Sequence, residues 1–180
     1  MSELKIYRNG QGEPVLAETR AASIREALGR IGVVYERWKP HRTLPADAEQ
    51  DEIIEAYREE IDRLMQSYGF QSVDVVRMAP SDPNRETARL RYLHEHVHQE
   101  DEVRFLAEGE ATFYLNHDGD IYSVHCVAGD LITVPARMPH WFDMGEHPDF
   151  TMIRLFTRNG GPGSVFTGSD ISMRFPGLGR

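Results

Sequence analysis

The stretch that decides the fold of this chain reads His96-Val97-His98-Gln99-Glu100-Asp101-Glu102. It holds two imidazoles and a carboxylate, and a third imidazole, His140, follows 38 residues after Glu102. Imidazoles with a carboxylate form a ligand set suited to a first-row transition metal. Because alternate residues of a strand point to the same side, His96 and His98 can project together into one cavity.

Glu102 has the same parity as the two histidines but lies farther along the chain. On a straight strand it would stand roughly 13 Å beyond His98, at about 3.3 Å per residue. The three side chains can therefore share one metal only if the chain bends through residues 99–101. That segment is polar and acidic, as is typical of a bend. His140 must then arrive from a separate strand.

Glycine and proline punctuate the sequence around these residues. Gly109 follows Glu102 with six residues between them, and Gly129 and Pro135 have five residues between them. Together with the histidines, these positions resemble the two cupin motifs, a pair of hairpins that wraps a metal inside a small β-barrel. The alternative interpretation is a histidine-rich surface strand followed by an acidic turn.

Length and composition exclude several classes of protein. The chain has 180 residues, enough for one domain with a real core. Its net charge is −9 and no Lys/Arg-rich run is present, so neither nucleic acid nor an anionic membrane is expected as a partner. The single cysteine, Cys126, rules out an intramolecular disulfide and fits a reducing compartment. With no apolar run that could span a bilayer and no apolar start, we expect a cytoplasmic protein.

The first third of the chain is expected to be partly helical. Ser23 and Glu26 form a capping-box pair, which predicts a short helix ending near Gly29 or Gly32. The clearest helix is predicted over 46–68, where apolar residues repeat at intervals of three and four and a glycine follows. Its other face is acidic and is most simply a solvated surface.

Strand-like patterns dominate the remainder. We expect strands over 33–38, 73–78, 111–116, 121–127, 131–134 and 150–157. Asp118-Gly119 is a strong hairpin signal. Short strands with such turns predict a mainly β fold, a cupin-type β-barrel (double-stranded β-helix or jelly roll) with N-terminal helices packed outside. We expect one domain, with a helical part containing at least one strand over 1–72, the metal-binding barrel over 73–158, and an irregular tail over 159–180.

Four protein ligands on a six-coordinate ion leave two positions open. A structural zinc site would instead be closed and would usually contain cysteine. Imidazoles and a carboxylate with open positions suit Fe(II), Ni(II) or Mn(II). Two open positions can hold a bidentate oxygen ligand such as an enediolate, or one substrate oxygen with water or dioxygen.

Two arginines are candidates for binding a substrate in this cavity. Arg104 shares parity with Glu102 on one expected strand and should point to the same side. A buried guanidinium needs a partner, which predicts an anionic substrate or a nearby carboxylate. A salt bridge to a neighbouring strand is an equally good interpretation. Arg154, on the strand expected over 150–157, is the second candidate.

Four further residues flank the expected site. Asp101 could act as an acid or base near the metal or orient a ligand histidine, although a solvated turn residue is the simpler account. His94, two residues before His96, could replace a ligand or lie behind one. Phe105 and Phe142 are interpreted as core or pocket wall.

Longer segments resemble one cupin family, the acireductone dioxygenases of methionine salvage. The two central blocks carry most of this resemblance, and shorter segments extend it over most of the chain. The blocks are residues 95–105 and 129–145, and the shorter segments are 31–33 with Trp38, 153–156 and 166–168. Residues 160–164 depart from the pattern, because relatives tend to carry an aromatic residue before the Phe-Thr-Gly segment.

The resemblance implies a specific activity. His96, His98, Glu102 and His140 would bind one Fe(II) or Ni(II) per monomer. The substrates would be dioxygen and an enediol, 1,2-dihydroxy-3-keto-5-(methylthio)pentene, with Arg104 and Arg154 nearby. Iron would direct carbon–carbon cleavage to 4-methylthio-2-oxobutanoate and formate, and nickel to 3-(methylthio)propanoate, formate and carbon monoxide. We expect the protein to act as a monomer.

Two other functions are consistent with the same residues. One is another small-molecule cupin dioxygenase or a metal-dependent isomerase, acting on a small oxyacid or a sugar phosphate. The other is a non-catalytic cupin that holds a metal as a sensor or binding module. A sugar phosphate should bring more basic side chains into the cavity, and a sensor usually carries a DNA-binding or signalling segment.

Overall fold

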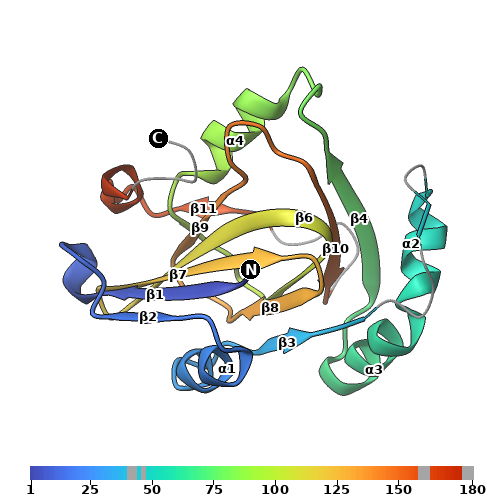
Figure 1. Ribbon diagram of the computed structural model, residues 1–180, viewed down its shortest axis with the longest axis horizontal. Coiled ribbons are helices and arrows are strands. Elements are labelled where there is room, and N and C mark those ends of the chain that lie inside the picture. The colour runs from blue at the N-terminus through green and yellow to red at the C-terminus, as the bar shows by residue number, and fades with distance from the viewer. Residues whose placement is uncertain (40–43, 46–47, 158–162, 176–180) are drawn as a thin grey trace.

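The longest strand, β6 (Glu102–His117), connects the two halves of a β-barrel in the computed structural model (Figure 1). The structure describes residues 1–39, 44–45, 48–157 and 163–175. The N-terminal part of β6 lies between β8 (Asp130–Val134) and β10 (Phe150–Phe156). Its C-terminal part lies between β7 (Asp120–Val127) and β9 (His140–Asp143). The expectation of a mainly β barrel is confirmed.

The remaining strands extend the two halves. On one side the order is β11-β5-β9-β6-β7-β1-β2, and on the other β4 pairs with β10 while β3 pairs with β8. These strands are β1 (Glu3–Tyr7), β2 (Leu16–Glu18), β3 (Tyr35–Arg37), β4 (Ser72–Met78), β5 (His96–Val97) and β11 (Val165–Phe166). Short 3-10 helices cover Arg8–Gly10 and Ile171–Arg174.

Four α-helices of the described residues lie outside the barrel. They are α1 (Ala21–Gly29), α2 (Gln50–Ala56), α3 (Arg58–Tyr68) and α4 (Arg85–Tyr92), and α4 lies across the barrel from α1 and α3 (Figure 1). Helices α2 and α3 bury Ile53, Ile61 and Leu64 against outward-facing residues of the barrel such as Val103. Among the described residues, no helix is long and apolar enough to cross a membrane.

The pleat of β6 decides which side chains enter the barrel. Glu102 and Arg104 line the interior cavity, whereas the buried Val103 and Phe105 pack on the helix side. Phe105 stacks on aromatic rings there and does not line the cavity, so its interpretation as pocket wall is wrong and its interpretation as core is right. The physical reason is that Phe105 has the opposite parity to Arg104 on one strand.

Several predicted elements differ from the observed ones. The helix predicted over 46–68 is two helices, because Tyr57 leaves helical geometry (φ −124°, ψ 23°) and packs its ring edge-on against Phe105. The predicted start at residues 46–47 lies outside the described residues. Helix α1 begins before Ser23, and the carboxylate of Glu18 accepts the backbone N–H of Arg20 there, so the capping-box prediction is wrong. The ends at Gly29 and Gly69 are as predicted.

Three strands and one α-helix of the described residues had no sequence prediction. Strands β1 and β2 are short, and β11 lies in the tail that was expected to be irregular. Helix α4 buries none of its residues, so it lacks the apolar periodicity that reveals a helix. The positions of all four depend on pairing or ion pairs with distant parts of the chain, which local patterns do not report.

A bulge in β6 reverses its inward-facing parity. Thr151 of β10 pairs with Glu108, and the next residue, Met152, pairs with Leu106, so Ala107 is the extra residue. Before the bulge the even-numbered residues face inward, and after it Ala111, Phe113 and Leu115 do so. Gly109 (φ +77°) follows the bulge where β10 crosses closely. Bulges bend strands and increase twist in this way.

Gly109→Ala should therefore destabilise the barrel severely. An added Cβ would lie 1.9 Å from the Asp149 carbonyl oxygen and 2.8 Å from the Phe150 Cα. The positive φ costs about 1–2 kcal/mol, and the clash should raise the loss to about 3 kcal/mol or more. Gly119→Ala is the matched control, since Gly119 has φ +87° and open space around it. Urea unfolding measures both, and equal losses would contradict the packing argument.

Candidate metal centre

Three imidazoles meet inside the barrel at one end of the cavity. The ring nitrogens of His96, His98 and His140 that could bind a metal all lie within 4.8 Å of one another. Antiparallel pairing of β5 with β9 sets His96 directly opposite His140, and His98 follows just beyond β5. All three side chains are buried. The fold thus brings together His96 and His140, which are 44 positions apart in the sequence. As expected, His140 comes from a separate strand.

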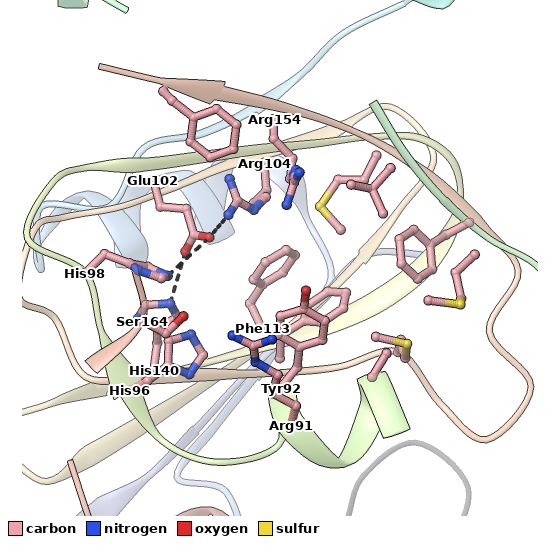
Figure 2. Close-up of a pocket in the computed structure, with 18 of the residues that line it drawn as sticks. Arg91, Tyr92, His96, His98, Glu102, Arg104, Phe113, His140, Arg154 and Ser164 are labelled. Carbon is pink, nitrogen blue, oxygen red and sulfur yellow. Dashed lines mark hydrogen bonds and ion pairs between the residues drawn. The ribbon is translucent and has the colours of Figure 1, made fainter. Parts of the chain in front are cut away.

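Glu102 completes the group through the expected bend. The chain leaves β5 after Val97, turns through residues 99–101 and enters β6 at Glu102. One carboxylate oxygen lies 3.0 Å from Nε2 of His140, and the other lies 3.6 Å from Nε2 of His98 (Figure 2). The carboxylate therefore lies against two of the three imidazoles, while the group whose ligand atoms all lie within 4.8 Å of one another consists of the three histidines.

Backbone carbonyls orient the three rings. In each ring Nδ1 is paired with a carbonyl oxygen, so Nδ1 carries the proton and donates it, because a carbonyl only accepts. The pairs are His96 with His94 (2.8 Å), His140 with Met138 (2.8 Å) and His98 with Gly163 (3.2 Å). The lone pair of every Nε2 is left facing the centre, which is the orientation that a metal ligand needs.

Burial keeps these imidazoles neutral. Desolvation lowers the pKa of His96, His98 and His140 from 6.5 to about 4, and the charge of Arg104 acts in the same direction. Neutral imidazole is the form that binds a metal. The three nitrogen donors are therefore available at neutral pH.

Arg104 projects from β6 into the same cavity, and its guanidinium donates to the carboxylate of Glu102 (Figure 2). It also donates to the carbonyl of Val103 and lies over the ring of Phe156, 5.4 Å from the ring centroid. Burial, followed by the charge of Arg154, lowers the pKa of Arg104 to about 9. A buried guanidinium needs an anionic partner, and for Arg104 this partner is Glu102, a candidate metal ligand.

Arg154 lies beside Arg104, because the two residues pair across β10 and β6. Its guanidinium forms a two-pronged ion pair with Asp74 of β4, at 2.8 Å and 2.6 Å. It also lines the cavity. Arg154 therefore makes a salt bridge to a neighbouring strand at the cavity wall, and its role toward a substrate stays a prediction.

The cavity has a volume of about 290 Å³ and two chemically different ends. The histidines, Glu102 and the two arginines form the polar end. The apolar end is lined by Val76, Met78, Phe113, Phe142, Met144, Phe150 and Met152. In Figure 2 the sulfur-bearing side chains lie across the cavity from the labelled histidines. Such a shape accommodates a small ligand with an oxygen-rich head and an apolar, soft tail.

Other candidate residues lie away from this centre. Asp101 is exposed, does not line the cavity and accepts the backbone N–H of Ala136 at 2.8 Å, so it ties the bend to the segment before His140. The His94 side chain is exposed and packs against Phe166, and only its carbonyl reaches the site. Neither side chain joins the converging donors.

Sequence reasoning missed the residues that α4 and the tail contribute. Ala88, Arg91 and Tyr92 line the cavity from α4, and Gly163 and Ser164 line it from the tail. A run without glycine or proline over residues 84–100, directly after Pro83, was an available signal for α4. No local signal indicates that the tail returns to β5.

Known proteins share this architecture. The ARD/ARD' family model matches residues 6–162. The chain is 47% identical to the acireductone dioxygenase of Aquifex aeolicus, with 98% of this chain and 96% of the relative covered. It is also 47% identical to that of Parvibaculum lavamentivorans, with the same coverage.

A solved structure of an acireductone dioxygenase from Bacillus anthracis, with a cadmium ion in its active centre, matches with a TM-score of 0.78. The identity is 27%, and the match covers 91% of this chain and 98% of that one. Both the barrel and the family-model match extend over most of the chain. This chain belongs to the ARD/ARD' family, the acireductone dioxygenases, and has their cupin fold.

Proposed function

We propose that this protein is an acireductone dioxygenase that cleaves 1,2-dihydroxy-3-keto-5-(methylthio)pentene with dioxygen. The observation that carries the proposal is the cluster of three neutral imidazoles, with Glu102 beside two of them, at the polar end of a two-ended cavity. The names of the relatives support it. No second function has a specific observation in its favour.

The donor set fits one Fe(II) or Ni(II) per chain, held by His96, His98, Glu102 and His140. Three neutral nitrogens and one carboxylate on a six-coordinate ion leave positions for oxygen ligands. When bound, the metal would supply a Lewis acid for the enediol oxygens and a site for reaction with dioxygen. Manganese would also accept these donors, so the family resemblance is what favours iron and nickel.

The surrounding side chains have separate roles in this proposal. Arg104 holds the Glu102 carboxylate in place, and the positive charges of Arg104 and Arg154 favour the anionic form of the enediol. The methionines and aromatic rings of the apolar end suit the methylthio tail, because thioether sulfur contacts aromatic rings favourably. The walls also limit access of water to the polar end.

We propose that the protein acts as a monomer in the cytoplasm. All residues around the cavity come from one chain, so no partner is needed to complete the site. The single thiol, Cys126, is buried, and burial raises its pKa, so it remains an inert thiol in a reducing compartment.

The products should depend on the metal. Protein loaded anaerobically with Fe(II), mixed with acireductone and then exposed to oxygen, should yield 4-methylthio-2-oxobutanoate and formate. The Ni(II) form should yield 3-(methylthio)propanoate, formate and carbon monoxide. Loss of the enediolate absorbance gives the rate, and chromatography identifies the products. Absence of substrate loss above the metal-free control, with one metal bound per chain, would refute the function.

His140→Ala should abolish stable metal binding. Loss of an outer partner of a metal ligand already costs about 10–100-fold in affinity, so loss of a ligand should cost more than about 100-fold. His94→Ala is the matched control, because only the backbone carbonyl of His94 contacts the site. Elemental analysis and competition with a chelator measure both variants. Equal retention in the two would show that His140 is not a ligand.

The stability of the metal-free protein should fall as the pH drops from about 6.5 to about 4. The three histidines have a pKa of about 4 when folded and 6.5 otherwise, so the unfolded chain is protonated first. The slope is at most about 1.4 kcal/mol per pH unit for each histidine. Above pH 6.5 both states are neutral and the contribution vanishes. In a variant with glutamine at all three positions, the free energy of unfolding measured with urea should depend less steeply on pH. The same pH dependence in both proteins would contradict the role of the histidines.

A further inference from the structure

Helix α4 forms one side of the cavity entrance and contributes no fully buried residue to the core. Its residues Ala88, Arg91 and Tyr92 line the cavity, yet the helix buries none of its side chains. Figure 2 shows Arg91 and Tyr92 on the side of the cavity opposite Arg104 and Arg154. Its apolar contacts are partial: Ala88 packs against the core while only partly buried, and the ring of Tyr92 lies edge-on to that of Phe142, so a polar attachment would fix the helix further.

An ion pair with β9 supplies that attachment. Arg89 binds Asp143 through two nitrogens, with Nε 2.8 Å from one oxygen and a terminal nitrogen 3.3 Å from the other. The Asp143 side chain is fully buried, and Asp143 belongs to the same strand as His140. Because two-pronged arginine–carboxylate pairs fix geometry as well as distance, α4 is held at a defined position relative to the histidines.

Arg91 differs from the other cavity arginines in lacking a carboxylate. Arg104 is paired with Glu102, and Arg154 is paired with Asp74. Over residues 1–39, 44–45, 48–157 and 163–175, no carboxylate forms an ion pair with Arg91. Its positive charge at the entrance is therefore available to a ligand.

The charge of the whole chain makes such a cation useful. A net charge of −9 repels small anions at long range. A positive group at the mouth of a low-dielectric cavity raises the local concentration of an anion there. Arg104 and Arg154 each share their charge with a carboxylate, so among the described residues that line the cavity Arg91 is the arginine with an unshared charge.

We propose that Arg91 is an anion-receiving residue: it binds the oxygen-rich, anionic end of the substrate at the entrance and the carboxylate products as they leave. The identity of that anion as an enediolate rests on the proposed function. The class of ligand, a small oxyanion, rests on Arg91 alone. Arg89 acts as a positioning residue, because it holds α4 and hence Arg91 at the entrance.

Calorimetric titration of the Ni(II)-loaded protein with oxalate tests the proposal without turnover. Arg91→Gln should weaken oxalate binding about tenfold, and Arg91→Lys, which keeps the charge, should restore most of it. Arg85→Gln is the matched control, because Arg85 lies on the same helix, does not line the cavity and donates to the carbonyl of Asp82. It should bind oxalate like the unmodified protein.

Kinetics supply the second readout. For acireductone, Arg91→Gln should lower kcat/KM about tenfold with little change in kcat, and high salt should shrink the difference by screening. Unchanged oxalate affinity in Arg91→Gln, or an equal loss in Arg85→Gln, would overturn the role of Arg91 even if turnover is normal. If the unmodified protein binds oxalate through Arg91 but does not consume acireductone, the proposed function fails and this inference stands.

Discussion

The bulge in β6 is the constraint on which the other features depend. One strand supplies both walls of the barrel, and a strand shows alternate residues to alternate sides. Without the extra residue Ala107, the parity that sends Glu102 and Arg104 inward would turn Phe113 away from the cavity. The bulge therefore allows one continuous strand to carry polar chemistry at one end and the apolar wall at the other.

At the polar end, the protein alone does not fully offset the free-energy cost of burying charged groups. Removing Glu102 and Arg104 from water is costly, and their mutual attraction offsets only part of that cost. The three imidazoles are neutral and point their lone pairs inward, so they do not balance the negative charge of the Glu102 carboxylate. A divalent cation among these donors would compensate the carboxylate and use the lone pairs together. Folding thus prepares a site whose electrostatics favour occupation.

The two-residue period predicted much of this from sequence. It grouped His96 with His98, required the bend before Glu102 and directed Arg104 inward. The same rule, applied to Phe105, would have placed that ring on the helix side. Parity decides the side of a strand but not exposure: Glu95 has the opposite parity to His96, yet it is buried and accepts hydrogen bonds from Asn116 and Thr167. The run without glycine or proline over residues 84–100 could have indicated helix α4, but its position depends on a distant ion pair that no local pattern reports.

The orientation of the three imidazoles has an evolutionary consequence. Each Nδ1–H is held by a main-chain carbonyl, and a carbonyl persists whatever side chain its residue carries. Positions 94, 138 and 163 can therefore drift without altering the ring tautomers, provided the backbone keeps its path. At position 163 it is the carbonyl of a glycine that accepts the hydrogen bond from His98. The geometry of the histidine ligands therefore does not depend on the side chains at these three positions, and those side chains can change during evolution.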